Sequence, residues 1–160
     1  MAKAVLISIR PRWCQKIVDG EKTIEVRKNR PKLKTPFKCY IYCTKKNGGL
    51  IKGDIPTTVG YIAKNEGKVI GEFVCDEIIS IAGAGRISSD IARPTCIEPA
   101  ELHRYLGAAN GYGWHISDLK IYDQPRELGA FRKPEYPTGL RLEDDEIKRP
   151  PQSWCYVEVL

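Results

Sequence analysis

The sequence of 160 residues lacks several features that mark membrane, secreted or nucleotide-loop proteins. No apolar run approaches the roughly 18 residues that cross a bilayer, and no signal peptide is recognisable at its start. The glycines at 83 and 85 are not followed by the Gly-Lys-Ser/Thr of a phosphate-binding loop. Internal repeats and low-complexity tracts are also missing. We therefore expect a cytoplasmic protein that makes no membrane contact.

Paired cysteine spacing is missing as well. The six cysteines are Cys14, Cys39, Cys43, Cys75, Cys96 and Cys155. None forms a C-x-x-C pair, and most lie in apolar runs, where a free cysteine behaves as a small hydrophobe. A zinc site built from Cys39, Cys43 and either His103 or His115 is disfavoured, because structural zinc sites usually show paired ligand spacing. We expect no metal, no cofactor and no disulfide framework.

The charge of the chain is concentrated in one segment. The net charge is +6, but residues 21–52 hold ten Lys or Arg and two acids, for a net charge of +8. The other residues hold sixteen bases and eighteen acids, for a net charge of −2. Such a basic segment suits a polyanion, RNA or DNA, and predicts salt-dependent affinity. The alternative is a solvated face that keeps the protein soluble.

Residues 10–27 predict a short helix, a stop and a strand. Pro11 suits the first helical position, and Gly20 can take the left-handed conformation that ends a helix at Asp19. From Thr23 the side chains alternate, so Glu25 and Arg27 should share one face of the strand. The sequence thus places two opposite charges within reach of a single ligand group.

Charges on this helix run against its dipole. Arg10 and Arg12 lie at the N-terminus, where the macrodipole is already positive, and Asp19 lies near the negative end. An anion docked at the N-terminus would explain the two arginines, since backbone N–H groups and guanidinium groups both bind phosphate. The alternative is that both arginines are simply solvated or paired with distant acids.

Two motifs resemble the signature of the ASCH domain family. They are G-x-K-x-x-E-x-R at residues 20–27 and S-x-R-P-x-W at residues 8–13, with weaker matches at 67–73 and 153–158. ASCH domains are related to the PUA domain, a small RNA-binding β-barrel. The resemblance implies an α+β, β-rich fold: a small PUA-like barrel of about six strands with two or three helices.

Local patterns place the elements of this fold. Strands are expected at residues 3–9, 23–27, 37–44, 69–81, 115–122 and 153–159, and helices at 11–19 and 98–106. The whole chain, 1–160, should form one domain. Turn signals indicate an insertion at 45–67 with a short strand near 59–63, and prolines indicate an irregular stretch at 123–151.

The leading functional hypothesis is binding of RNA or a modified nucleotide in a basic cleft beside the first helix. Lys22 and Arg27 would hold phosphates or a base edge, Glu25 would orient Arg27 or accept a hydrogen bond from an exocyclic amine, and Trp13 would stack on a base. The ligand-binding residues expected on this hypothesis are Arg10, Arg12, Trp13, Lys22, Glu25 and Arg27.

Two alternatives remain open. The resemblance implies that some relatives hydrolyse the acetyl amide of N4-acetylcytidine with a lysine, a threonine and a glutamate. Lys22 matches that lysine, but Glu25 stands where those relatives have threonine, so Thr23 and Glu25 would have to share the catalytic roles. Nuclease activity in the same cleft is a variant of this hypothesis. The last alternative is structural, an ion pair of Glu25 with Arg27 and no ligand.

Overall fold

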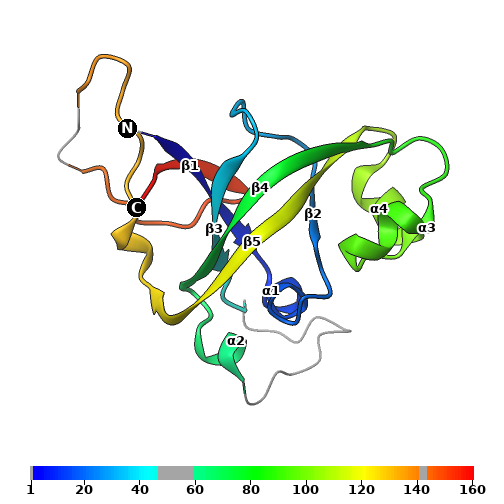
Figure 1. The fold of residues 1–160 in the computed structure, drawn as a ribbon, viewed down its shortest axis with the longest axis horizontal. Coiled ribbons are helices and arrows are strands. Elements are labelled where there is room, and N and C mark those ends of the chain that lie inside the picture. The colour runs from blue at the N-terminus through cyan, green and yellow to red at the C-terminus, as the bar shows by residue number, and fades with distance from the viewer. Residues whose placement is uncertain (1, 47–59, 141–143) are drawn as a thin grey trace. The chain divides into compact units, whose positions relative to one another are not determined.

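The computed structural model describes residues 2–46, 60–140 and 144–160 of the chain (Figure 1). Its helices are α1 (Pro11–Val18), α2 (Tyr61–Lys64), α3 (Ser89–Ala92) and α4 (Pro99–Leu106), with 3-10 turns η1 (Arg93–Thr95) and η2 (Leu128–Ala130). Its strands are β1 (Lys3–Ile9), β2 (Ile24–Arg27), β3 (Phe37–Cys43), β4 (Val69–Ile81), β5 (Gly111–Arg126) and β6 (Trp154–Glu158). No helix in this part of the chain is long and apolar enough to cross a bilayer.

The six strands form one sheet in the order β2-β5-β4-β3-β1-β6. β1 runs parallel to β3 and antiparallel to β6, and β2 runs antiparallel to β5. The predicted α+β class and strand number are confirmed. The predicted closure into a barrel is not: within the described residues β2 and β6 are open edges of the sheet.

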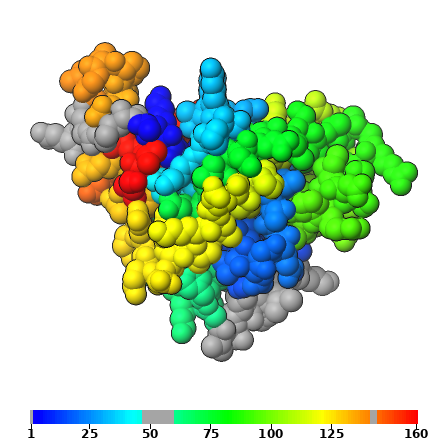
Figure 2. Space-filling model, in the orientation of Figure 1, coloured from blue at the N-terminus to red at the C-terminus, as the bar shows by residue number. Residues whose placement is uncertain are grey.

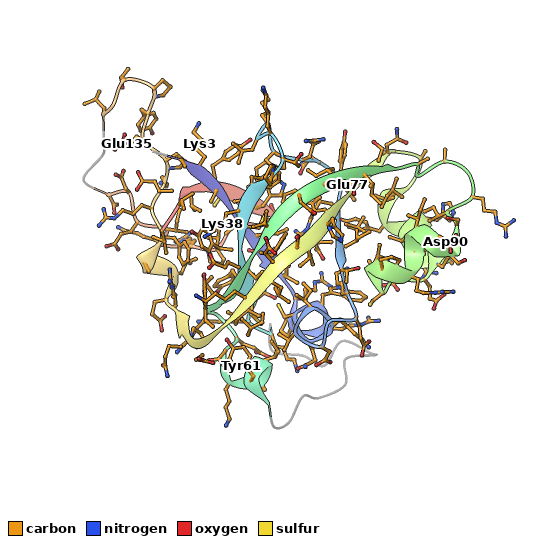
Figure 3. All side chains as sticks on the ribbon, in the orientation of Figure 1. Lys3, Lys38, Tyr61, Glu77, Asp90 and Glu135 are labelled. Atoms are coloured by element: carbon orange, nitrogen blue, oxygen red, sulfur yellow. The ribbon has the colours of Figure 1, made fainter. Side chains whose placement is uncertain are left out.

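Short helices account for the differences from the sequence prediction. The described residues hold four helices instead of two or three, because α2 and α3 have only four residues each, too few to repeat a helical pattern in the sequence. The predicted strand near 59–63 is wrong at its described positions, where α2 begins at Tyr61. Figure 3 labels Tyr61 on α2. Its hydroxyl donates to the carbonyl of Tyr122 and lies 3.1 Å from the carbonyl oxygen of Ile70. Residues 47–59 of the predicted insertion lie outside the described part.

The chain divides into two compact units. The first unit comprises residues 1–15, 38–73 and 119–160, and the second comprises residues 16–37 and 74–118. β4 and β5 run through both. One buried hydrophobic cluster of the first unit consists of Ala4, Leu6, Tyr40, Tyr42, Val69, Tyr122, Phe131, Ile147 and Val157. Tyr40 packs edge-on against Phe131, with ring centroids 4.9 Å apart, so this tyrosine of β3 serves the core.

A buried hydrophobic cluster in the core of the second unit joins β2 to the helical segment. It consists of Val26, Ile81, Ile87, Ala92, Leu102 and Leu106. Leu102 and Leu106 stand four residues apart on α4, one helical turn, and both are buried. The predicted helix at 98–106 is confirmed as Pro99–Leu106. In the space-filling view the green atoms of the segment that holds α3 and α4 lie packed together (Figure 2).

Close backbone approach explains the glycine at position 83. A Cβ atom there would lie 1.9 Å from the carbonyl oxygen of Ala109 and 2.8 Å from that of Gly107. The Gly83 carbonyl oxygen also lies 3.0 Å from Nδ1 of His103. Gly83 therefore serves the contact between the end of α4 and the loop after β4, consistent with the absence of a phosphate-loop motif.

Candidate functional site

A tight turn connects α1 to β2 and sets the position of Lys22. Gly20 has the left-handed conformation (φ 76°), as predicted, and its N–H donates to the carbonyl of Ile17. The N–H groups of Glu21 and Lys22 both donate to the carbonyl of Lys16, at 3.0 Å each. The last carbonyls of the helix are thereby satisfied, and the chain enters β2 two residues later.

Lys22 is buried, with 2% of its surface exposed. Its Nζ donates to the backbone carbonyl of Thr95 at 2.7 Å and lies 3.3 Å from Oε2 of Glu25. Long charged side chains are almost never fully buried unless they are paired, and Lys22 has a carboxylate and a carbonyl beside it. The motif lysine is therefore an internal group of the second unit.

Glu25 lies between two cations. Its Oε1 accepts a hydrogen bond from Nε of Arg27 at 3.0 Å and lies 2.8 Å from Nη2 of the same guanidinium. The two residues stand two apart on β2, so they share one face of the strand, as the sequence predicted. Oε2 of Glu25 is buried and accepts no hydrogen bond within the described residues, although the Lys22 ammonium lies beside it. We call Lys22, Glu25 and Arg27 the motif cluster.

The segment around η1 closes the motif cluster from one side. The Thr23 N–H donates to the carbonyl of Pro94 at 2.9 Å, next to the Lys22–Thr95 bond. The Thr95 hydroxyl donates to the carbonyl of Ala92 and accepts from the N–H of Ile97 at 3.1 Å. Thr95 is fully buried. Sequence reasoning missed Thr95 because no local pattern links it to a lysine 73 residues away.

The remaining predicted ligand residues belong to the first unit. Arg10 and Arg12 are exposed, and Trp13 is half-buried. The Arg12 guanidinium lies 4.5 Å from the centroid of the Trp13 ring, a cation–π contact. The structure thus brings together Lys22, Glu25 and Arg27 in the second unit. Arg10, Arg12 and Trp13 are assigned to the first unit. A basic cleft that unites all six stays a prediction.

A basic loop follows the motif cluster. Four cations and no acid occupy residues 28–34, and all four side chains belong to exposed residues: Lys28, Arg30, Lys32 and Lys34. This part of the basic segment lies entirely within the second unit. The loop begins directly after Arg27, the last residue of β2. The second unit therefore presents a run of exposed positive charge next to a partly buried, oriented guanidinium.

Two aromatic side chains lie near Arg27. Tyr112 stands directly opposite Arg27 in the pairing of β2 with β5, so both side chains lie on the same face of the sheet. Tyr105 on α4 is 41% exposed. The pKa of its phenol is raised, mainly by burial. The charge of Glu25 also raises this pKa, and the charge of Arg27 lowers it. From the sequence alone, helical spacing places Tyr105 on one apolar face with Leu102 and Leu106, and no local pattern links it to Arg27.

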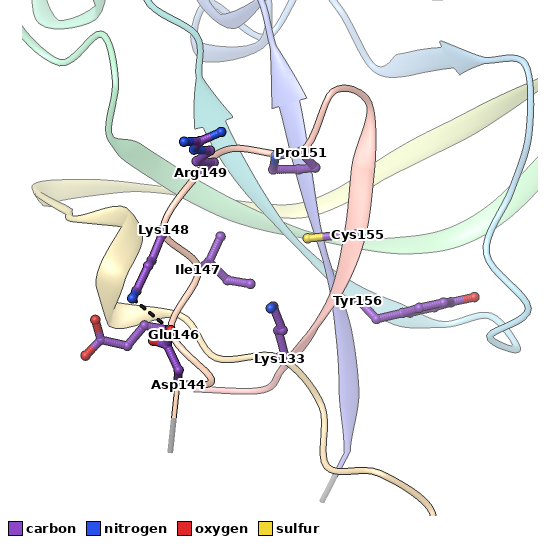
Figure 4. A pocket seen from close by; sticks show the side chains of 9 residues that line it. All are labelled: Lys133, Asp144, Glu146, Ile147, Lys148, Arg149, Pro151, Cys155 and Tyr156. Atoms are coloured by element: carbon purple, nitrogen blue, oxygen red, sulfur yellow. Dashed lines mark hydrogen bonds and ion pairs between the residues drawn. The ribbon is translucent and has the colours of Figure 1, made fainter. Parts of the chain in front are cut away.

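Two cavities lie elsewhere in the units. The second unit has one of about 270 Å³, lined by Ser89, Ala92, Arg93, Cys96, Ile97, Glu98 and Pro99. The first unit has one of about 460 Å³, lined by the nine residues drawn in Figure 4. In it Lys148 is paired with Asp144 at 2.8 Å, and burial raises the pKa of Cys155 to about 11. Neither cavity is lined by a residue of the motif cluster.

The described residues contain no group of three or more His, Cys, Asp or Glu side chains that could hold a metal ion. Cys39 and Cys43 are buried in β3, and all six cysteines are free thiols. His115 contacts Asp76 instead, with 2.6 Å between Nδ1 and Oδ1.

Comparison with known proteins supports the fold. The family model of the ASCH domain matches residues 7–93, which include the motif cluster and end before Thr95. An ASCH protein from Zymomonas mobilis has a crystal structure with a TM-score of 0.64 and 20% identity, over 97% of this chain and 87% of that one. One mutant of the Zymomonas protein has a TM-score of 0.63 and 20% identity, over 98% of this chain and 91% of that one. A second mutant has a TM-score of 0.62 and 19% identity, over 97% of this chain and 88% of that one. No curated protein matches the sequence.

The burial of Lys22 predicts a large stability effect for its removal. Lys22→Met leaves the Glu25 carboxylate buried without one cation and the Thr95 carbonyl without its donor, so we expect the free energy of unfolding to fall by ~3–5 kcal/mol. The free energy of unfolding is measured by urea denaturation, monitored by circular dichroism.

The matched control is Lys16→Met, which removes the exposed ion pair of Lys16 with Glu21 and should leave stability unchanged within error. Equal, small effects of both substitutions would contradict a desolvated motif cluster.

Proposed function

This chain belongs to the ASCH domain family, and we propose that it binds RNA or a modified nucleotide on its second unit, at Arg27 and the basic loop that follows. The observation that carries this proposal is the guanidinium of Arg27, held by Glu25 next to four exposed cations. Guanidinium groups recognise phosphate through paired N–H donors, and lysines add sequence-independent attraction.

Arg27 is restrained before any ligand arrives. Two of its nitrogens face one oxygen of Glu25, and Glu25 in turn lies beside the buried Lys22 ammonium. A restrained side chain loses less conformational entropy on binding than a mobile one. Lys22, at 2% exposure, supports Glu25 from inside the unit. On this proposal Lys22 positions the binding residues, and Arg27 and the basic loop contact phosphate.

Charge reversal in the basic loop tests this proposal. We expect Arg30→Glu/Lys32→Glu to lower the affinity for a short single-stranded RNA at low salt by about tenfold or more. Two lost phosphate contacts should also flatten the slope of log affinity against log salt by roughly 1.4. Fluorescence anisotropy over a salt series measures both quantities.

The matched control is Lys64→Glu/Lys120→Glu, which makes the same charge change at two exposed lysines of the first unit. This control should keep most of the wild-type affinity for the RNA and the wild-type slope of log affinity against log salt. Equal losses in both double variants would show that only net charge matters and would contradict a site on the second unit.

Hydrolysis of N4-acetylcytidine is the second candidate function. One observation favours it: Lys22, Glu25 and a threonine, Thr95, lie together in the second unit, and these are the residue types that the family resemblance associates with the reaction. The Thr95 hydroxyl, however, is engaged with the carbonyl of Ala92, and Lys22 reaches Thr95 through its backbone carbonyl. The geometry therefore favours binding over this chemistry.

Incubation with N4-acetylcytidine separates the two functions. If the motif cluster is hydrolytic, chromatography will detect cytidine with the wild-type protein, and Glu25→Gln and Lys22→Met will each reduce its rate by about 100-fold or more, the scale of a lost general acid or base. Folding of each variant is checked by circular dichroism.

Absence of cytidine with the wild-type protein would reject the hydrolase. Full activity of Lys22→Met would remove the lysine from the mechanism. Nuclease cleavage is detected by running the RNA from the anisotropy measurements on a denaturing gel.

A further inference from the structure

Tyr105 is an exposed aromatic residue on α4, a helix with one buried face. Its neighbours on α4, Leu102 and Leu106, are buried in the core of the second unit together with Val26 of β2. The ring of Tyr105 instead remains 41% exposed. Because α4 packs against the strand that carries Arg27, Tyr105 occupies a fixed position beside the end of β2.

A cation of the basic loop lies over the Tyr105 ring. The distance from Nζ of Lys28 to the ring centroid is 4.9 Å, within the range of a cation–π contact. Lys28 follows Arg27 directly, and Arg27 itself stands opposite Tyr112. Two tyrosines and two cations, all of the second unit, therefore surround the end of β2. Aromatic rings interleaved with cations are typical of surfaces that bind single-stranded nucleic acid.

We propose that Tyr105 is a stacking subsite for an unpaired nucleobase, and that Lys28 leaves the ring to contact the adjoining phosphate when the base binds. This inference rests on the proposed nucleic-acid-binding function and gives its ligand a class, single-stranded RNA. A duplex hides the faces of its bases, so it offers nothing for the Tyr105 ring to stack on.

The contact of Lys28 with Tyr105 is exchangeable. A lysine over an exposed ring is held weakly, because water solvates both the ammonium and the ring edge. A nucleobase covers more of the ring than the ammonium does. The displaced Lys28 ammonium can then contact a phosphate, which compensates its charge better than the ring. Stacking accepts every base, since each has an aromatic face. Tyr105 therefore selects for an unpaired strand and leaves base identity to other residues.

Substitution of Tyr105 tests the subsite. We expect Tyr105→Ala to weaken binding of a short single-stranded RNA by about 5- to 150-fold, the ratio reported by alanine substitution of residues that stack on one base. Tyr105→Phe should retain the affinity, because the ring and not the hydroxyl stacks. The control is Tyr136→Ala, which removes a tyrosine of the first unit that is 55% exposed and should leave binding unchanged.

An abasic version of the same oligonucleotide isolates the stacking contribution. It carries the same phosphates without bases, so wild type and Tyr105→Ala should bind it equally. If Tyr105→Ala binds the intact RNA like wild type while Arg30→Glu/Lys32→Glu binds it weakly, the stacking subsite is wrong and the proposed function stands. If the wild-type protein binds no RNA at all, the stacking subsite and the proposed RNA binding are both overturned.

Discussion

The carboxylate of Glu25 is the group on which the second unit depends. It is 95% buried between the ammonium of Lys22 and the guanidinium of Arg27. Removal of an ion from water costs several kcal/mol, and mutual attraction repays this cost only where the geometry is good and hydrogen bonds are made. The buried charges of Lys22 and Glu25 thus compensate each other, and the partly exposed Arg27 adds a second cation beside the carboxylate.

This constraint connects parts of the second unit that are distant in sequence. Lys22 bonds to the Thr95 carbonyl, and Thr23 bonds to Pro94, so the start of β2 is attached to η1. α4 begins at Pro99, only four residues after Thr95. The position of α4, and of Tyr105 upon it, is therefore tied to the same strand that carries Arg27. The buried motif cluster and the exposed tyrosine and basic loop beside it therefore share one scaffold.

Local pattern predicted the elements of this fold well and its long-range contacts poorly. Alternation placed Glu25 and Arg27 on one face, and Gly20 marked the end of α1, because both signals lie within a few residues. The burial of Lys22 could not be predicted, since its carbonyl partner belongs to Thr95. A lysine in a basic segment suggested a solvent-facing phosphate ligand, and only the tertiary structure shows that it is internal.

A double-mutant cycle between Lys22 and Glu25 most directly tests whether their two buried charges stabilise each other. The free energy of unfolding is measured for wild type, Lys22→Met, Glu25→Gln and the double variant. A desolvated pair predicts that the loss in the double variant is smaller than the sum of the single losses by at least ~1 kcal/mol, because removing both charges leaves neither uncompensated. Single losses that add to within about 0.5 kcal/mol would contradict the account.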